Sequence, residues 1–77
     1  MPPLPRLSGR QVVKIFESLG WNVARRRGSH IILVMEENAA TLSIPDHREI
    51  AKGTLRSLIR NAGLKVAEFT LASGESK

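Results

Sequence analysis

The strongest constraint on the fold is a run of five apolar residues, 31–35, near the middle of a chain of 77 residues. Successive side chains of a β-strand point to opposite faces, so a strand over this run is apolar on both faces. Such a strand belongs in the middle of a sheet, with both faces covered or with one face used for binding. We therefore expect a single domain over residues 1–77 that is built around this strand, with residues 1–7 and 73–77 flexible.

Two segments have the spacing of helices that could cover one face of this strand. Apolar residues recur at helical intervals over residues 9–19 and 52–62, and each segment is followed by a glycine that can end a helix. Ser8 and Gln11 have the spacing of a capping box, in which each side chain bonds the backbone amide of the other residue. We expect a helix over each segment.

The remaining segments predict a small antiparallel sheet. A strand is expected over residues 21–27 with Trp21 and Val23 facing inward, although Trp21 could instead stack on a base. Gly28 and Ser29 then form a tight connection to the strand over 30–35. A third strand is expected over residues 41–44, followed by a polar loop, the second helix and a short helix whose buried residues are Val66, Phe69 and Leu71. The predicted fold is α+β, with the helices on one face of a three-stranded antiparallel sheet.

The sequence leaves open which face of the central strand points away from the helices. Ile32 and Val34 share one face with His30, because residues two apart in a strand lie on the same side. Ile31, Leu33 and Met35 share the other face. Both assignments fit an apolar run, so either face could point away from the helices.

Basic residues gather on two predicted elements. Lys and Arg number twelve against seven Asp and Glu, and the resulting charge of +5 favours an acidic partner, either a nucleic acid or a protein. Candidate RNA contacts on the first hairpin are Arg25, Arg26, Arg27, Gly28 and Ser29. A second candidate group, spaced by four on the second helix and able to contact successive phosphates, is Lys52, Arg56 and Arg60. The alternative is an ordinary solvated basic surface.

His30 is the first candidate for chemistry. An imidazole with an ordinary pKa of about 6.5 can take or give a proton near neutral pH. Cleavage of RNA without a metal needs a base for the ribose 2′-hydroxyl and an acid for the leaving 5′-oxygen, and arginines can stabilise the charge on phosphorus. His47 in the polar loop is the second candidate. For each histidine the alternative is a structural residue that only bonds its neighbours.

Other classes of site and location are not indicated by the sequence. No cysteine is present, and the histidines and carboxylates have no recognisable metal-ligand spacing, so we expect no metal and no cofactor. Residues 1–6 lack the apolar segment of a signal peptide, and the apolar run at 31–35 is too short to span a membrane. We expect a cytoplasmic protein with no membrane partner.

Four short motifs and one longer block stand out along the chain. The short motifs are Leu7-Ser8-Gly9-Arg10, Leu19-Gly20-Trp21, Gly28-Ser29-His30 and Ile44-Pro45-Asp46-His47. The block over residues 52–64 is the most specific part. Together these segments resemble the HicA family of toxins, and the resemblance extends from about residue 6 to residue 70.

The resemblance implies a fold like that of double-stranded RNA-binding domains and the activity of an mRNA interferase, an endoribonuclease, in a type II toxin–antitoxin system. It implies stress-response function, a catalytic role for His30, and neutralisation by a HicB-type antitoxin that covers the active surface. It also implies a toxin that is monomeric when free and hetero-oligomeric with its antitoxin. Two alternatives stay open: a non-catalytic RNA-binding module, and an inactive relic that only binds its antitoxin, through a surface containing Ile32 and Val34.

Overall fold

The computed structural model describes residues 6–74, apart from the side chains of Asn38 and Ala39. Of the residues expected to be flexible, 1–5 and 75–77 lie outside the described part, whereas Leu7 is described and is buried in the core. The described elements follow the predicted α+β order: α1 (Gly9–Ser18), β1 (Asn22–Arg27), β2 (His30–Met35), β3 (Asn38–Pro45), α2 (Lys52–Asn61) and α3 (Val66–Ala72).

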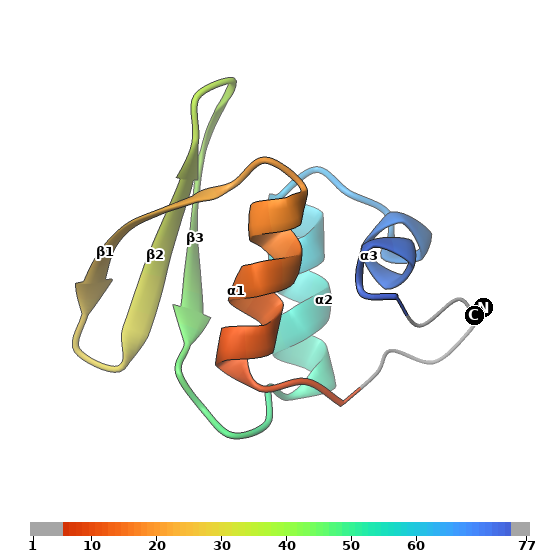
Figure 1. Cartoon of the computed structure of the whole chain (residues 1–77), viewed down its shortest axis with the longest axis horizontal. Helices are drawn as coiled ribbons and strands as arrows, with labels where there is room; N and C mark the ends of the chain where they lie inside the picture. Colours follow the sequence, from red (N-terminus) through yellow and green to blue (C-terminus); the bar gives the residue numbers. More distant parts are fainter. Residues whose placement is uncertain (1–5, 75–77) are drawn as a thin grey trace.

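The sheet is antiparallel with the order β1-β2-β3, so the apolar run forms the central strand as predicted. Figure 1 shows α1 and α2 together beside the sheet, α3 beyond them, and β1 as the strand farthest from the helices. This arrangement matches the expected fold, similar to a double-stranded RNA-binding domain. The turn between β1 and β2 and the loop after β3 lie at the same end of the sheet (Figure 1).

The burial of β2 settles which of its faces points outward. Ile31 and Leu33 belong to the core cluster beneath the helices, together with Leu42 and Ile44 of β3. Ile32 lies outside that cluster, and it shares its face with His30 and Val34 because alternate residues point the same way. We call the face that carries His30, Ile32 and Val34 the open face of the sheet.

The predicted helix signals at the start of α1 are confirmed. The Gln11 amide donates to Ser8 Oγ over 3.2 Å, and the Ser8 amide donates to Gln11 Oε1 over 2.8 Å, which completes the capping box. Phe16 lies on the buried side of α1 and contacts Trp21 and Phe69, with ring centroids 6.3 and 5.2 Å away. Trp21 is therefore a core residue, and stacking on a base is not available to it.

Three details differ from the predicted pattern. Val23 was expected to be buried, but it is exposed, and it lies on an edge strand whose register with β2 shifts between Val23 and Arg25. Leu71 is also exposed, because it lies two residues, or about 200° of helical rotation, from the buried Phe69. The third strand begins at residue 38 and not at 41, since β2 reaches Met35 and offers ladder partners to the returning chain.

Backbone hydrogen bonds clamp the start of α1 to the loop after β3. The Gly9 amide donates to the His47 carbonyl over 2.9 Å, and the Ile50 amide donates to the carbonyl of the buried Leu7 over 2.7 Å. The Asp46 amide donates to the Ser29 carbonyl over 2.7 Å. The loop thus holds both the first helix and the turn between β1 and β2 at one end of the sheet.

Candidate functional site

His30 is the first residue of β2 and stands at the end of the sheet. It pairs with Arg27 on one side and with Pro45 on the other, and it is exposed. Within residues 6–74 its side chain has no hydrogen-bond partner. The imidazole is therefore free to contact a ligand at the edge of the open face.

Gly28 gives the turn before His30 its shape. Its φ of 59° lies in the left-handed region, and no non-glycine residue in the described chain has a positive φ. A two-residue connection with positive φ at its first position has the form of a type II′ turn, which glycine favours. Because the Ser29 carbonyl also accepts the Asp46 amide, the turn is fixed to the loop on the far side of β2.

The three consecutive arginines of β1 divide between the two faces of the sheet. Arg25 pairs with Ile32 and Arg27 pairs with His30, so both of these arginines belong to the open face. Arg26 pairs with Ile31 and points to the helical side. The structure thus brings two of the three predicted cations to the face of His30, and it separates the third from them.

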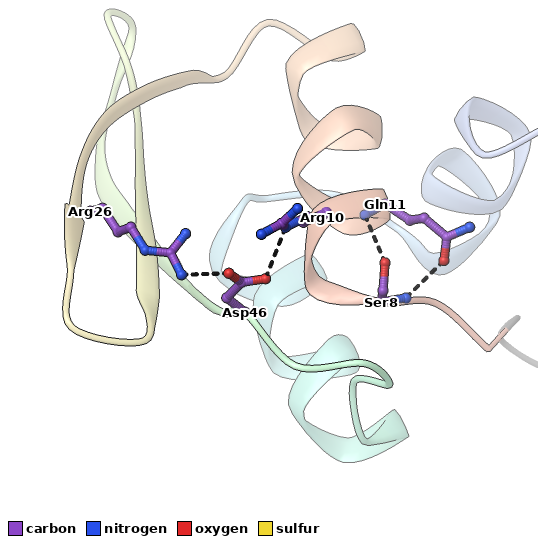
Figure 2. Close-up of polar contacts among 5 residues, drawn as sticks. All are labelled: Ser8, Arg10, Gln11, Arg26 and Asp46. Carbon is purple, nitrogen blue, oxygen red and sulfur yellow. Dashed lines mark hydrogen bonds and ion pairs between the residues drawn. The ribbon is translucent and has the colours of Figure 1, made fainter.

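Arg26 contacts the carboxylate of Asp46, which also forms an ion pair with Arg10 (Figure 2). Arg26 Nη2 donates to Asp46 Oδ2, and Arg10 Nε lies 3.4 Å from Asp46 Oδ1. The hydrogen bond from Arg26 lowers the pKa of Asp46 below its usual value, and the charge of Arg10 acts in the same direction against the opposing effect of partial burial. The carboxylate therefore stays charged well into the acidic range.

This ion-pair cluster predicts a pH dependence of stability. Because the pKa of Asp46 is lower in the folded chain than in the unfolded one, its contribution is fully present above the ordinary value of about 3.9 and is lost as the pH falls through the folded value. We expect Asp46→Asn to lose stability less steeply than the wild type below about pH 4 in thermal unfolding. Glu49→Gln, an exposed carboxylate in the same loop, should keep the wild-type slope. Equal slopes for wild type and Asp46→Asn would contradict this role of Asp46.

The apolar residues of the open face are unequally accessible. Ile32 is only 7% exposed, although it lies outside the core cluster, since it sits between Arg25 and Ser43 on the neighbouring strands. Val34 is 38% exposed. Of the two residues expected to meet an antitoxin, Val34 therefore offers more surface, and the antitoxin role of both remains a prediction.

The basic row of the second helix lies away from His30. Lys52, Arg56 and Arg60 are all exposed on α2, which packs in the layer opposite the open face. Arg56 and Arg60 border an open hollow of about 370 Å³ whose lining includes Ile59 and Leu64. Their proposed RNA contacts remain a prediction, but these contacts would belong to a different surface from that of His30.

His47 lies at the same end of the sheet as His30. It lies two residues after Pro45, which pairs with His30 in the sheet. Its backbone carbonyl accepts a hydrogen bond from the Gly9 amide. Its side chain is exposed and has no hydrogen-bond partner within residues 6–74. The structure thus places both candidate histidines at the same end of the sheet, and a role of His47 in proton transfer also remains a prediction.

Arg10 and Asp46 are the charged residues near this site that the sequence analysis did not select. In the sequence both residues stand out only as members of the motifs that carry the family resemblance. The alternation of side chains along a strand was the available signal, because it places Arg26 opposite its two neighbours, on the face where the helices lie. The partners of Arg26 come from distant parts of the chain, which no local pattern specifies.

Comparison with known proteins adds a family relationship to this geometry. The profile of a family described as HicA toxin of bacterial toxin-antitoxin matches residues 9–64, which include β1, β2, the loop with Asp46 and α2. No curated protein matches the chain.

Every helix within residues 6–74 is too short or too polar to span a membrane. In the same residues, no three histidine or carboxylate side chains gather as metal ligands would.

Proposed function

We propose that this chain, which belongs to the HicA family of toxins of bacterial toxin–antitoxin systems, is a metal-independent endoribonuclease. Its proposed substrate is mRNA in the cytoplasm. The observation that carries this proposal is the position of His30. It is an exposed histidine at the end of the open face, and its partner on β1 is Arg27. Arg25, the partner of Ile32, is the next arginine along the same face.

The chemistry follows from the groups that share this face. His30 takes the proton of a ribose 2′-hydroxyl while water protonates the leaving 5′-oxygen, or His30 gives a proton to that oxygen while water takes the first proton. The 2′-oxygen forms a bond to phosphorus as the bond from phosphorus to the 5′-oxygen breaks. Arg27, and Arg25 further along, stabilise the negative charge that grows on the phosphoryl oxygens. The products are a 2′,3′-cyclic phosphate and a free 5′-hydroxyl.

The antitoxin partner implied by the family is proposed to be a HicB-type protein that covers the open face. Val34 supports this proposal, because it is an exposed apolar side chain on the same face as His30. A protein seated on Val34 would also cover His30 and exclude RNA. Neutralisation would thus follow from steric exclusion at the catalytic face.

The test of the proposed reaction uses the purified wild-type protein and a single RNA of defined sequence in excess EDTA. We expect fragments that end in a 2′,3′-cyclic phosphate and begin with a 5′-hydroxyl, because the ribose itself supplies the attacking oxygen. The same sequence made with 2′-O-methyl riboses should remain intact, since it has no 2′-hydroxyl to attack phosphorus.

Each other outcome contradicts a stated part of the proposal. A requirement for Mg²⁺ would contradict the metal-independent mechanism, and 5′-phosphate ends would indicate attack by water. Binding that weakens steeply with salt, with no cleavage over hours, would favour the non-catalytic RNA-binding module. Binding to an antitoxin alone, with no affinity for RNA, would favour the inactive relic.

A further inference from the structure

The carboxylate of Asp46 lies between two guanidinium groups that come from different elements (Figure 2). The side chain of Asp46 is 13% exposed, whereas those of Arg10 and Arg26 are 79% and 54% exposed. The carboxylate is therefore the inner member of the cluster, and the two cations are accessible from outside. Two arginines around one anion have the donor arrangement that also binds a phosphate group.

We propose that Arg10 and Arg26 form a binding site for one backbone phosphate of the RNA, and that Asp46 occupies this site in the free protein. The two arginines carry more charge than the single carboxylate neutralises. Each arginine also has five N–H donors, of which the contacts with Asp46 involve few. A phosphate that approaches from solvent meets these remaining donors, and it competes with Asp46 for the guanidinium groups.

The position of this site suits an RNA strand that also reaches His30. The Asp46 amide bonds the Ser29 carbonyl over 2.7 Å, and Ser29 directly precedes His30. Arg27 and His30 lie on the open face, while Arg26, between Arg25 and Arg27, points to the other side. A strand that bends around this end of the sheet would pass from the catalytic face to Arg26 and Arg10. The inference rests on the proposed function, because it assumes that RNA binds at His30.

If Asp46 competes with a phosphate for the two arginines, removing its charge should strengthen RNA binding. Removing Asp46 leaves both arginines free and removes the charge that repels a phosphate. We expect Asp46→Asn to bind a 2′-O-methyl RNA oligonucleotide about two- to fivefold more tightly than the wild type, the range set by one exposed ion pair. The slope of log affinity against log salt should steepen by less than about 0.7, the value for one full phosphate contact on a single strand, because the wild type already makes this contact in part.

Glu49→Gln is the matched control for the overall charge. It removes one negative charge from the same loop, and within residues 6–74 Glu49 has no ion pair. We expect its affinity to change less than that of Asp46→Asn and its salt slope to equal that of the wild type. The probe has no 2′-hydroxyl to attack phosphorus, so binding is measured separately from cleavage.

A second pair of variants tests the cations directly, should Asp46→Asn be too unstable to measure. Arg10→Gln is expected to weaken binding and to lower the salt slope by up to about 0.7, the part of one phosphate contact that the wild type makes. Lys65→Gln, which removes the same charge beside α3 on the far side of the helical layer, should leave the slope unchanged.

The outcomes separate this site from the proposed function. If the wild type cleaves RNA while Asp46→Asn matches Glu49→Gln in affinity and slope, the phosphate site is wrong and the ribonuclease proposal stands. Weaker binding by Asp46→Asn would also overturn the site, because the carboxylate would then help to hold the arginines for RNA. If no variant binds the oligonucleotide, the phosphate site is wrong, and if the wild type also leaves RNA intact, the ribonuclease proposal fails with it.

Discussion

Replacing Gly9 with alanine is expected to lower the free energy of unfolding by about 3 kcal/mol. A Cβ at this position would lie 2.0 Å from the Pro45 carbonyl oxygen and 3.0 Å from Asp46 Cα. Both are backbone atoms of the loop after β3, so neither can move aside as a flexible side chain could. The start of α1 must therefore separate from the loop.

This separation would disrupt several contacts together. It would weaken the bond from the Gly9 amide to His47, the bond from the Ile50 amide to Leu7, and the ion pair between Arg10 and Asp46. Stabilities of native domains are about 0.05–0.15 kcal/mol per residue, so a loss of this size is a large part of the total for so small a chain. The fall in melting temperature should be about 12–24 °C, measured by circular dichroism.

Gly53→Ala is the matched control, because Gly53 also lies in the first turn of a helix. No atom lies within 4 Å of a Cβ added there, and its φ is not positive. Alanine at this position should raise stability by about 0.4–1 kcal/mol, because it restricts the unfolded chain. A Gly9→Ala protein as stable as the wild type would contradict the close contact between α1 and the loop.

The elements with local signals could be predicted from the sequence. The capping box at Ser8 and the glycine after each of the first two helices specify helix ends through contacts within a few residues. The five apolar residues of β2 predicted the central strand for the same reason. The face of β2 that points outward was not predictable, because both faces are apolar and only the helical packing distinguishes Ile31 from Ile32.

For the charged residues of the site, too, the sequence indicated what is close along the chain but not which distant residues meet. The sequence indicated that Arg25, Arg26 and Arg27 precede a turn with His30, and the structure places this turn at the end of the sheet. The ion pairs of Asp46 join residues 20 or more positions apart along the chain, so they depend on the assembled fold. The position of the basic row on α2, away from His30, likewise follows from the packing of the helices.

Replacing His30 with alanine is expected to reduce RNA cleavage by about 10²–10⁴-fold, the usual contribution of a positioned acid or base. The side chain is exposed and makes no hydrogen bond within residues 6–74, so its loss should leave the melting temperature nearly unchanged. Binding to the 2′-O-methyl oligonucleotide should also persist, since Arg25 and Arg27 remain on the open face. These two controls separate a loss of chemistry from a loss of fold or affinity.

The measurement that tests the catalytic face most directly is the single-turnover cleavage rate in EDTA, compared among wild type, His30→Ala and His47→Ala. His47 lies at the same end of the sheet but in the loop, so the comparison separates the open face from its surroundings. We predict that the loss at His30 exceeds the loss at His47 by at least about tenfold. Cleavage by His30→Ala at the wild-type rate, or a larger loss in His47→Ala, would contradict the assignment of His30 and its face as the catalytic site.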